Sequence, residues 1–338
     1  MREVIISDPT LRDGNHAVGH KLTAAQIAAY ARAADDARIP IVEVGHGNGL
    51  GASSLQVGLA AIGDHEMLAT AREQLRHSKL GVHVIPGFGT IRKDIAAAID
   101  HGVDVFRVAS HCTEANTTRQ HIEYLRGREK EVFGVLMMSH MATRETLRDE
   151  CLKMESYGAQ GVILMDSAGA YVPEDVTERI RELTEHLAIP TGFHAHNNLG
   201  LAIANSIAAV RAGATIIDGT ARGFGAGAGN TQLEVLVAVL EKLGYSTGVD
   251  LYKVLDAADI AERELMPFAP TIKSMSIVSG LAGVFSGFAK PVDRISREYS
   301  VDPRDVFFEL GKRSAVAGQE DLILEVAMQL AATQDVIA

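Results

Sequence analysis

The chain has 338 residues, 47% of them hydrophobic, and a formal net charge of −11. This composition is typical of a globular protein with a sizeable core, and its acidic balance argues against nucleic acid as a partner, since nucleic acid needs a basic surface. Two cysteines are too few for a disulfide framework and favour a cytoplasmic location. No apolar stretch is long enough to predict a signal segment or a membrane span.

Short β-branched runs alternate with helical patterns from the amino terminus to about residue 245. Eight strands that alternate with helices predict an α/β fold with a parallel sheet, and eight is the number that closes a (β/α)8 barrel, the TIM-barrel fold. An open, doubly wound sheet is the competing fold. The expected strands cover residues 4–6, 41–44, 81–85, 104–108, 132–137, 161–165, 191–196 and 215–218.

The pattern changes after Gly244, where only helical periodicity remains. We therefore expect a barrel domain over residues 1–248 and a helical C-terminal domain over residues 249–338. The expected C-terminal helices cover residues 251–264, 274–286, 303–310 and 320–333.

Polar side chains gather at the carboxyl ends of the expected strands. In a barrel these ends meet at one face, where the active site lies. We expect about half of the histidines there to be core or supporting groups rather than ligands. The polar set comprises Asp8, Glu43, His46, His83, Arg107, Ser110, His111, Ser139, His140, Asp166, Ser167, His194, His196 and Asp218.

His194 and His196 form the most informative motif of the chain. Residues two apart on a strand point to the same face, so the two imidazoles can hold one ion between them. Two histidines and a carboxylate make a common metal site with open positions, and Asp13 offers the carboxylate. The alternative is a pair of surface histidines at a strand end; together with Asp13, the pattern favours a metal site.

Arg12 and His16 flank this aspartate in the segment of residues 8–16. The guanidinium of Arg12 can fork onto a substrate carboxylate or a developing enolate, and His16 can move a proton near neutrality. The alternative for Arg12 is a structural ion pair with Asp13 or Glu43.

The glycine-rich segment of residues 223–230 follows the eighth expected strand. It is a weak candidate for a dinucleotide loop, because no initial βαβ unit carries the acidic residue of that fingerprint. It can instead bring the backbone and Asn230 close to a ligand, bind a phosphate, or form a tight turn.

No lysine of the sequence falls at the carboxyl end of an expected strand. A barrel that breaks a carbon–carbon bond works through a lysine Schiff base or through a metal, so this favours the metal. The sequence also has no GxSxG motif to indicate a serine nucleophile.

Several motifs in order along nearly the whole chain resemble the metal-dependent pyruvate aldolases and their relatives, the hydroxymethylglutaryl-CoA lyases and isopropylmalate synthases. Within that superfamily several segments resemble the 4-hydroxy-2-oxovalerate aldolases. The segments are residues 8–14 with His16, then 43–47, 111–115, 136–141, 194–199, 225–230 and 309–313.

The resemblance implies retro-aldol cleavage of 4-hydroxy-2-oxopentanoate to pyruvate and acetaldehyde, in the catabolism of aromatic hydrocarbons. It implies a divalent cation, usually Mn²⁺, with Mg²⁺, Co²⁺ and Zn²⁺ as alternatives. The expected metal ligands are Asp13, His194 and His196, and the expected catalytic residues are His16 and Arg12. Arg12, Ser167 and Phe285 are expected to bind the substrate, with Asn230, Glu43 and His46 around them.

The resemblance also implies a partner, an acylating acetaldehyde dehydrogenase that receives the volatile aldehyde through a channel in a hetero-oligomer. Its expected docking region is residues 265–338.

Three departures from the family pattern bear on the substrate: Phe285 stands where a tyrosine is usual, Asn48 where aspartate is frequent, and Arg222 adds a cation after strand eight. Phe285 motivates a second hypothesis, a biosynthetic aldolase that joins pyruvate or 2-oxobutyrate to a larger aldehyde. An acyl-CoA enzyme of the superfamily and a non-catalytic subunit are further alternatives. The last of these is disfavoured by the intact set of Asp13, His194, His196, Arg12 and His16.

Overall fold

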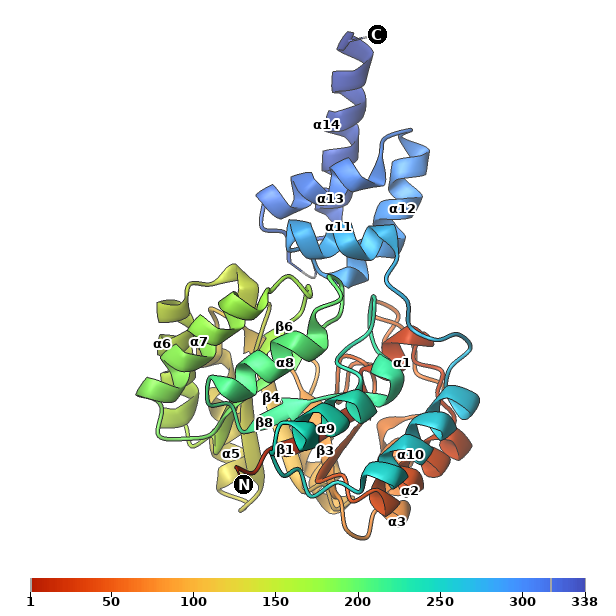
Figure 1. The fold of residues 1–338 in the computed structure, drawn as a ribbon. Helices are drawn as coiled ribbons and strands as arrows, with labels where there is room; N and C mark the ends of the chain where they lie inside the picture. Colours follow the sequence, from red (N-terminus) through yellow and green to blue (C-terminus); the bar gives the residue numbers. More distant parts are fainter. Residues whose placement is uncertain (1, 317, 338) are drawn as a thin grey trace.

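The computed structural model describes residues 2–316 and 318–337. Eight parallel strands form a closed barrel in which each strand pairs with the next and β1 pairs with β8, which confirms the predicted barrel over the open sheet (Figure 1). The strands are β1 Ile5–Leu11, β2 Ile41–Val44, β3 Lys79–Val84, β4 Val105–His111, β5 Glu131–Met137, β6 Gly161–Asp166, β7 Thr191–Ala195 and β8 Ile216–Asp218.

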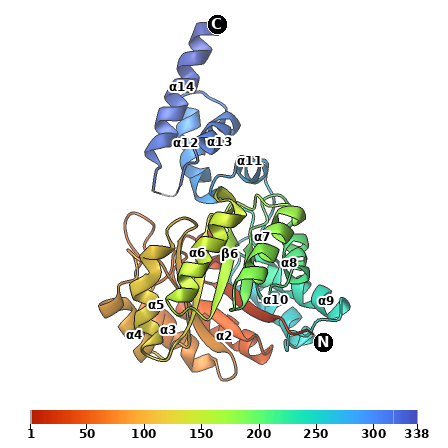
Figure 2. The ribbon, with the colours of Figure 1, turned by 90° about the vertical axis from the view of Figure 1, so that its left-hand side faces the viewer.

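Helices connect the strands and cover the outside of the barrel (Figures 1 and 2). They are α1 Gly14–Ala17, α2 Ala24–Asp36, α3 Asp64–Gln74, the π-helix η1 Ile91–Ile95, α4 Ala96–Asp100, η2 Ala115–Thr118, α5 Arg119–Arg126, η3 Ser139–Met141, α6 Arg144–Ser156, α7 Pro173–His186, α8 Ala202–Arg211, η4 Ala221–Gly223, α9 Leu233–Lys242 and α10 Leu251–Glu264. No helix in the two described stretches is both long and apolar enough to cross a membrane.

The interior of the barrel is apolar at one level and charged at the next. A buried cluster that includes Ile41, Val105 and Ile216, the first residues of β2, β4 and β8, fills the level toward the amino ends of the strands. Successive side chains of a strand alternate between its two faces, so the next inward-facing residues on these strands are Glu43, Arg107 and Asp218. The charged level thus lies at the carboxyl end of the barrel, where barrel active sites are built.

The C-terminal helices form a second body above that end of the barrel, with α14 projecting away from it (Figures 1 and 2). Their buried side chains make a hydrophobic cluster of their own, which includes Val292, Phe307 and Val326. The helices are α11 Ser274–Ala282, η5 Ser286–Phe288, α12 Ala289–Glu298, α13 Pro303–Lys312 and α14 Asp321–Ile337.

Two details of this body differ from the prediction. The helix expected over residues 274–286 ends at Ala282, because Gly283 takes a left-handed φ of 64° and stops it. The sequence interpretation also missed α12, whose Pro291 lies in the first turn, where a proline is tolerated because the helix needs no backbone N–H there.

Helix α10 lies on the barrel side of the molecule. Its buried residues Val254, Ala257 and Ala261 belong to the hydrophobic cluster of the barrel, and Gln26 at the start of α2 donates a hydrogen bond to the Glu264 carbonyl (2.6 Å). The boundary between residues 248 and 249 stays a prediction, although this packing favours a division after α10.

Candidate metal centre and active site

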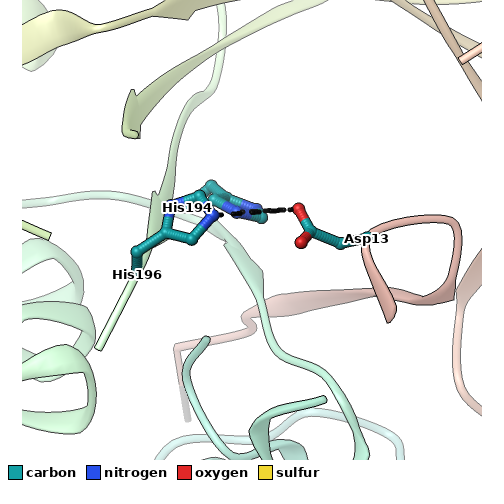
Figure 3. Close-up of side chains that lie close together, drawn as sticks. All are labelled: Asp13, His194 and His196. Carbon is teal, nitrogen blue, oxygen red and sulfur yellow. Dashed lines mark ion pairs between the residues drawn. The ribbon is translucent and has the colours of Figure 1, made fainter. Parts of the chain in front are cut away.

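Asp13, His194 and His196 converge at the carboxyl end of the barrel (Figure 3). Asp13 immediately precedes α1, His194 lies in β7 and His196 follows that strand. The Nε2 atoms of His194 and His196 are 3.7 Å and 4.0 Å from Asp13 Oδ2. Within the described residues, this is the only group of three or more such side chains with the spacing of a metal site.

Each candidate ligand is oriented by a second contact. The Nδ1 of His194 faces Asp218 Oδ2 at 2.7 Å, and the Nδ1 of His196 faces the Asp166 carbonyl at 2.9 Å. Hydrogen bonds at Nδ1 leave Nε2 of both rings for a metal. The Ala226 N–H donates to Asp13 Oδ1 (2.9 Å), which leaves Oδ2 toward the histidines.

The donor set fits a divalent cation. Burial would raise the pKa of Asp13, but the Arg12 guanidinium and the nearby histidines hold it well below its usual range, so the carboxylate is ionised. Burial lowers the pKa of His196 and favours the neutral imidazole that binds metals. The buried Nε2 of His194 has no hydrogen-bond partner anywhere in residues 2–316 and 318–337, as expected of an atom that awaits a ligand.

Arg12 lies beside the candidate ligands and is only 3% exposed. Its Nη1 is 2.8 Å from Asp13 Oδ2, and its Nε pairs with Glu43 Oε1, so both ion pairs considered from the sequence exist. Its Nη2 is buried without a hydrogen-bond partner in the described chain, and this donor can still bind a substrate oxygen.

His16 lies in α1, next to this centre. Burial lowers the pKa of His16 to about 4, so the imidazole is neutral near pH 7 and can accept a proton. His46 stacks on His20, with ring centroids 3.6 Å apart, and its Nε2 is 3.0 Å from the Gly58 carbonyl. His46 therefore supports the loop after β2 and does not join the metal cluster.

The remaining predicted site residues come from three different segments. Ser167 follows β6, and its Oγ accepts a hydrogen bond from the Met138 N–H (2.9 Å). Asn230 pairs with His196 in a β-bridge, and both polar atoms of its buried side chain lack a partner among the residues described. Phe285 lies in the second body, between α11 and η5.

Asn198 joins the barrel to the C-terminal body, a role that the sequence interpretation missed. Its Nδ2 donates to Ser286 Oγ (3.0 Å) and to the Ser276 carbonyl (3.2 Å), so the loop that carries Phe285 is tied to the residues after β7. The only signal in the sequence was the pair of asparagines directly after His196.

One expectation about the polar residues near the strand ends, that for Asp8, was wrong. The carboxylate of Asp8 faces outward and accepts a hydrogen bond from the Tyr30 hydroxyl of α2 (2.5 Å), so it does not reach the open end of the barrel. Arg222 lies in η4, shortly after β8, where the sequence predicted a cation. Its guanidinium pairs with three acidic side chains of α9 and α10, namely Glu234, Asp259 and Glu262.

Two family descriptions cover most of the chain. Residues 3–261 match the HMGL-like family, and residues 270–332 match the DmpG-like communication domain. The two regions correspond closely to the barrel with α10 and to the C-terminal body.

The fold is shared with distant proteins of known structure. The carboxyl transferase domain of Rhizobium etli pyruvate carboxylase superposes with a TM-score of 0.80 at 17% sequence identity, over 98% of this chain and 61% of that one. At this identity the likeness shows the fold alone.

Relatives of similar length are much closer in sequence. The 4-hydroxy-2-oxovalerate aldolase of Pectobacterium atrosepticum is 62% identical over 98% of this chain and 96% of its own length. The 4-hydroxy-2-oxovalerate aldolase of Spirochaeta aurantia is 65% identical over 97% of this chain and 96% of its own length. That of Streptomyces griseus is 61% identical over 98% of this chain and 97% of its own length. The chain therefore belongs to the 4-hydroxy-2-oxovalerate aldolase family, carbon–carbon lyases built on the HMGL-like barrel.

Proposed function

We propose that the protein cleaves 4-hydroxy-2-oxopentanoate to pyruvate and acetaldehyde, with a divalent cation held by Asp13, His194 and His196. The cluster of one carboxylate and two imidazoles at the carboxyl end of the barrel carries the proposal. The names of the relatives support it, and nothing in them favours a larger aldehyde. Mn²⁺ is our choice of metal, because oxygen and imidazole ligands suit it.

The chain's own groups account for the remaining chemistry. When bound, the cation would act as a Lewis acid toward the 2-oxo acid. His16 accepts the proton of the 4-hydroxyl group as the C3–C4 bond breaks and acetaldehyde leaves. The bonding electrons remain on C3 of the pyruvate fragment, whose enolate oxygen is stabilised by the Arg12 guanidinium. Protonation at C3 gives pyruvate.

Ser167 and Phe285 complete the proposed substrate site. Phe285 offers an aromatic ring without the hydroxyl of a tyrosine, so this position supplies packing and no hydrogen bond to the aldehyde half of the substrate. Asn230, Glu43 and His46 surround the site as supporting residues. Glu43 pairs with Arg12, and Asn230 lies against His196.

We propose an acylating acetaldehyde dehydrogenase as partner, docked on residues 265–338. The match to a communication domain supports this. Large apolar side chains are exposed in the region, among them Phe268 at 61%, Leu281 at 63% and Met328 at 52%. A cytoplasmic location belongs to the same proposal, supported by two buried cysteines that form no disulfide.

Pyruvate release tests the proposed reaction. Chelator-treated protein is assayed with 4-hydroxy-2-oxopentanoate, with and without Mn²⁺, Mg²⁺, Co²⁺ or Zn²⁺. We expect metal-dependent release that is lost in folded Asp13→Ala and His194→Ala variants, since each removes a ligand. His65→Ala, at an exposed histidine in the first turn of α3, is the matched control and should retain activity. Metal-independent release, or full activity of His194→Ala, would refute the proposal.

A further inference from the structure

Arg107 lies at the centre of a chain of buried charges inside the barrel, and its side chain is completely buried. Its Nη2 is 2.6 Å from Asp218 Oδ2, and its Nη1 is 3.1 Å from Glu43 Oε2. Asp218 is the carboxylate that contacts His194, and Glu43 is the carboxylate that contacts Arg12. One continuous path of contacts thus runs from His194 through Arg107 to Arg12.

The stability of the fold does not explain this path. Taking charges out of water is costly, and replacing buried ion pairs with apolar residues of similar volume is often neutral or stabilising. The level of the barrel just below shows that apolar side chains fill the same interior, since Ile41, Val105 and Ile216 form a buried cluster there. The charged level therefore calls for a role other than packing.

Arg107 determines how both carboxylates present their oxygens. Asp218 Oδ2 lies between the Arg107 guanidinium and His194 Nδ1, so the carboxylate is directed at the imidazole. With Nδ1 held in this way, the Nε2 atom of His194 points toward Asp13. Glu43 directs one oxygen at Arg107 and the other at Arg12 Nε. Because Glu43 binds Arg12 through Nε, the Nη2 atom of Arg12 stays available to a ligand, and it has no hydrogen-bond partner among the described residues.

We propose that Arg107 is a positioning residue that sets the metal ligand His194 and the substrate-binding Arg12 at the same time, through Asp218 and Glu43. The inference rests on the proposed metal-dependent function. It makes metal binding and 2-oxo acid binding depend on a residue that contacts neither ligand. Its guanidinium suits the task because a planar fork engages two carboxylates at once, whereas a lysine ammonium is a single point charge.

Calorimetric titration measures the two affinities separately, first with Mn²⁺ alone and then with pyruvate added to the Mn²⁺-loaded protein. We expect Arg107→Met to weaken Mn²⁺ binding by roughly ten- to hundredfold, the usual effect of losing a group that orients a metal ligand. It should also weaken pyruvate binding. Asp218→Asn should affect mainly Mn²⁺ binding, and Glu43→Gln mainly pyruvate binding.

Arg148→Met is the matched control, because this arginine also bridges two carboxylates, of Asp149 and Glu182, but on the outside of the barrel. It should leave both affinities unchanged. A folded Arg107→Met variant with wild-type affinity for either Mn²⁺ or pyruvate would overturn the inference. If that variant fails to fold, Arg107→Lys decides in the same way, since one ammonium cannot restore both contacts.

These outcomes are distinct from a failure of the proposed function. Wild-type protein that neither binds Mn²⁺ nor releases pyruvate would refute the function itself. If wild-type protein binds Mn²⁺ and releases pyruvate, but Arg107 variants bind Mn²⁺ or pyruvate with wild-type affinity, only the role of Arg107 would be refuted.

Discussion

A single buried carboxyl, that of Asp8, illustrates how a residue close to the active site in sequence can serve the fold instead. Its oxygens accept hydrogen bonds from the Thr10 N–H (2.9 Å), within β1, and from the Tyr30 hydroxyl, which attaches β1 to α2. Burial nevertheless raises the pKa of Asp8 to about 6. The group therefore changes charge within a range of pH in which the protein can be studied.

Asp8→Asn should flatten the dependence of stability on pH. A carboxyl whose pKa is raised by folding stabilises the native state fully below its unfolded pKa of about 3.9, and this contribution is lost as pH rises through the folded pKa near 6. The whole loss amounts to about 3 kcal/mol in the free energy of unfolding, of which about 2 kcal/mol falls between pH 4.5 and 7.5. Urea denaturation of both proteins between pH 4.5 and 7.5 measures it.

The exposed Asp256→Asn variant on α10 is the control for this experiment and should follow the wild-type pH profile. If the free energies of unfolding of wild type and Asp8→Asn differ by the same amount at every pH, the pKa of Asp8 is not raised by folding.

At the scale of elements, the glycine-rich loop of residues 223–230 holds Asp13, one of the proposed metal ligands. Its Ala226 N–H donates to Asp13 Oδ1, and the loop folds tightly enough for Asn230 N–H to reach the Gly223 carbonyl (2.9 Å). Gly229 has a φ of 87°, and an added Cβ would lie 2.1 Å from the Gly223 carbonyl oxygen. Among the interpretations considered from sequence, the structure thus favours close approach of the backbone over a dinucleotide loop.

Gly229→Ala should weaken Mn²⁺ binding, because the loop must move and carry the Ala226 N–H away from Asp13. Calorimetric titration with Mn²⁺ measures the effect. Gly248→Ala is the matched control: Gly248 has a φ of 70°, but no atom lies within 4 Å of its added Cβ. It should lose about 1 kcal/mol of stability to left-handed strain and leave Mn²⁺ affinity unchanged. Equal Mn²⁺ affinity in both variants would contradict this role of the loop.

At the scale of the whole molecule, the main hydrophobic cluster of the barrel domain is separate from that of the C-terminal helices. The larger one includes α10, and the smaller one is confined to the C-terminal helices. Polar contacts join the two bodies, including those of Asn198 and one between His140 Nε2 and the Gly283 carbonyl at 2.9 Å. Because packing is largely separate, we expect the two bodies to unfold in separate steps.

Two core substitutions assign these steps. Phe307→Ala should destabilise the C-terminal body by about 3–5 kcal/mol, because it opens a cavity at a fully buried site, and it should leave Mn²⁺ binding intact. Val254→Ala in α10 should instead lower the transition of the barrel. Differential scanning calorimetry separates the outcomes. If Val254→Ala shifts the same transition as Phe307→Ala, the domain boundary lies before α10, as the sequence predicted.

The architecture and the candidate ligands were predictable because their signals are local. Eight β-branched runs gave the barrel, and the alternation of side chains along β7 placed His194 and His196 on one face. The orientation of Asp8 was not predictable, since a short list of polar residues near strand ends does not say which face each occupies. The partners of Arg222 were likewise hidden, because α9 and α10 meet it only after folding.

The sequence by itself determined the barrel, the helical C-terminal region and the residue types of the candidate metal site, since these follow from short-range periodicity and motifs. Only the tertiary structure decided how the site is held. The contacts of Arg107 with Glu43 and Asp218 join residues of β4, β2 and β8, which are distant in sequence. The hydrogen bond from the Ala226 N–H to Asp13 joins the loop after β8 to the loop after β1. Such contacts depend on closure of the barrel, which brings its first and last strands side by side and directs alternate side chains into one interior.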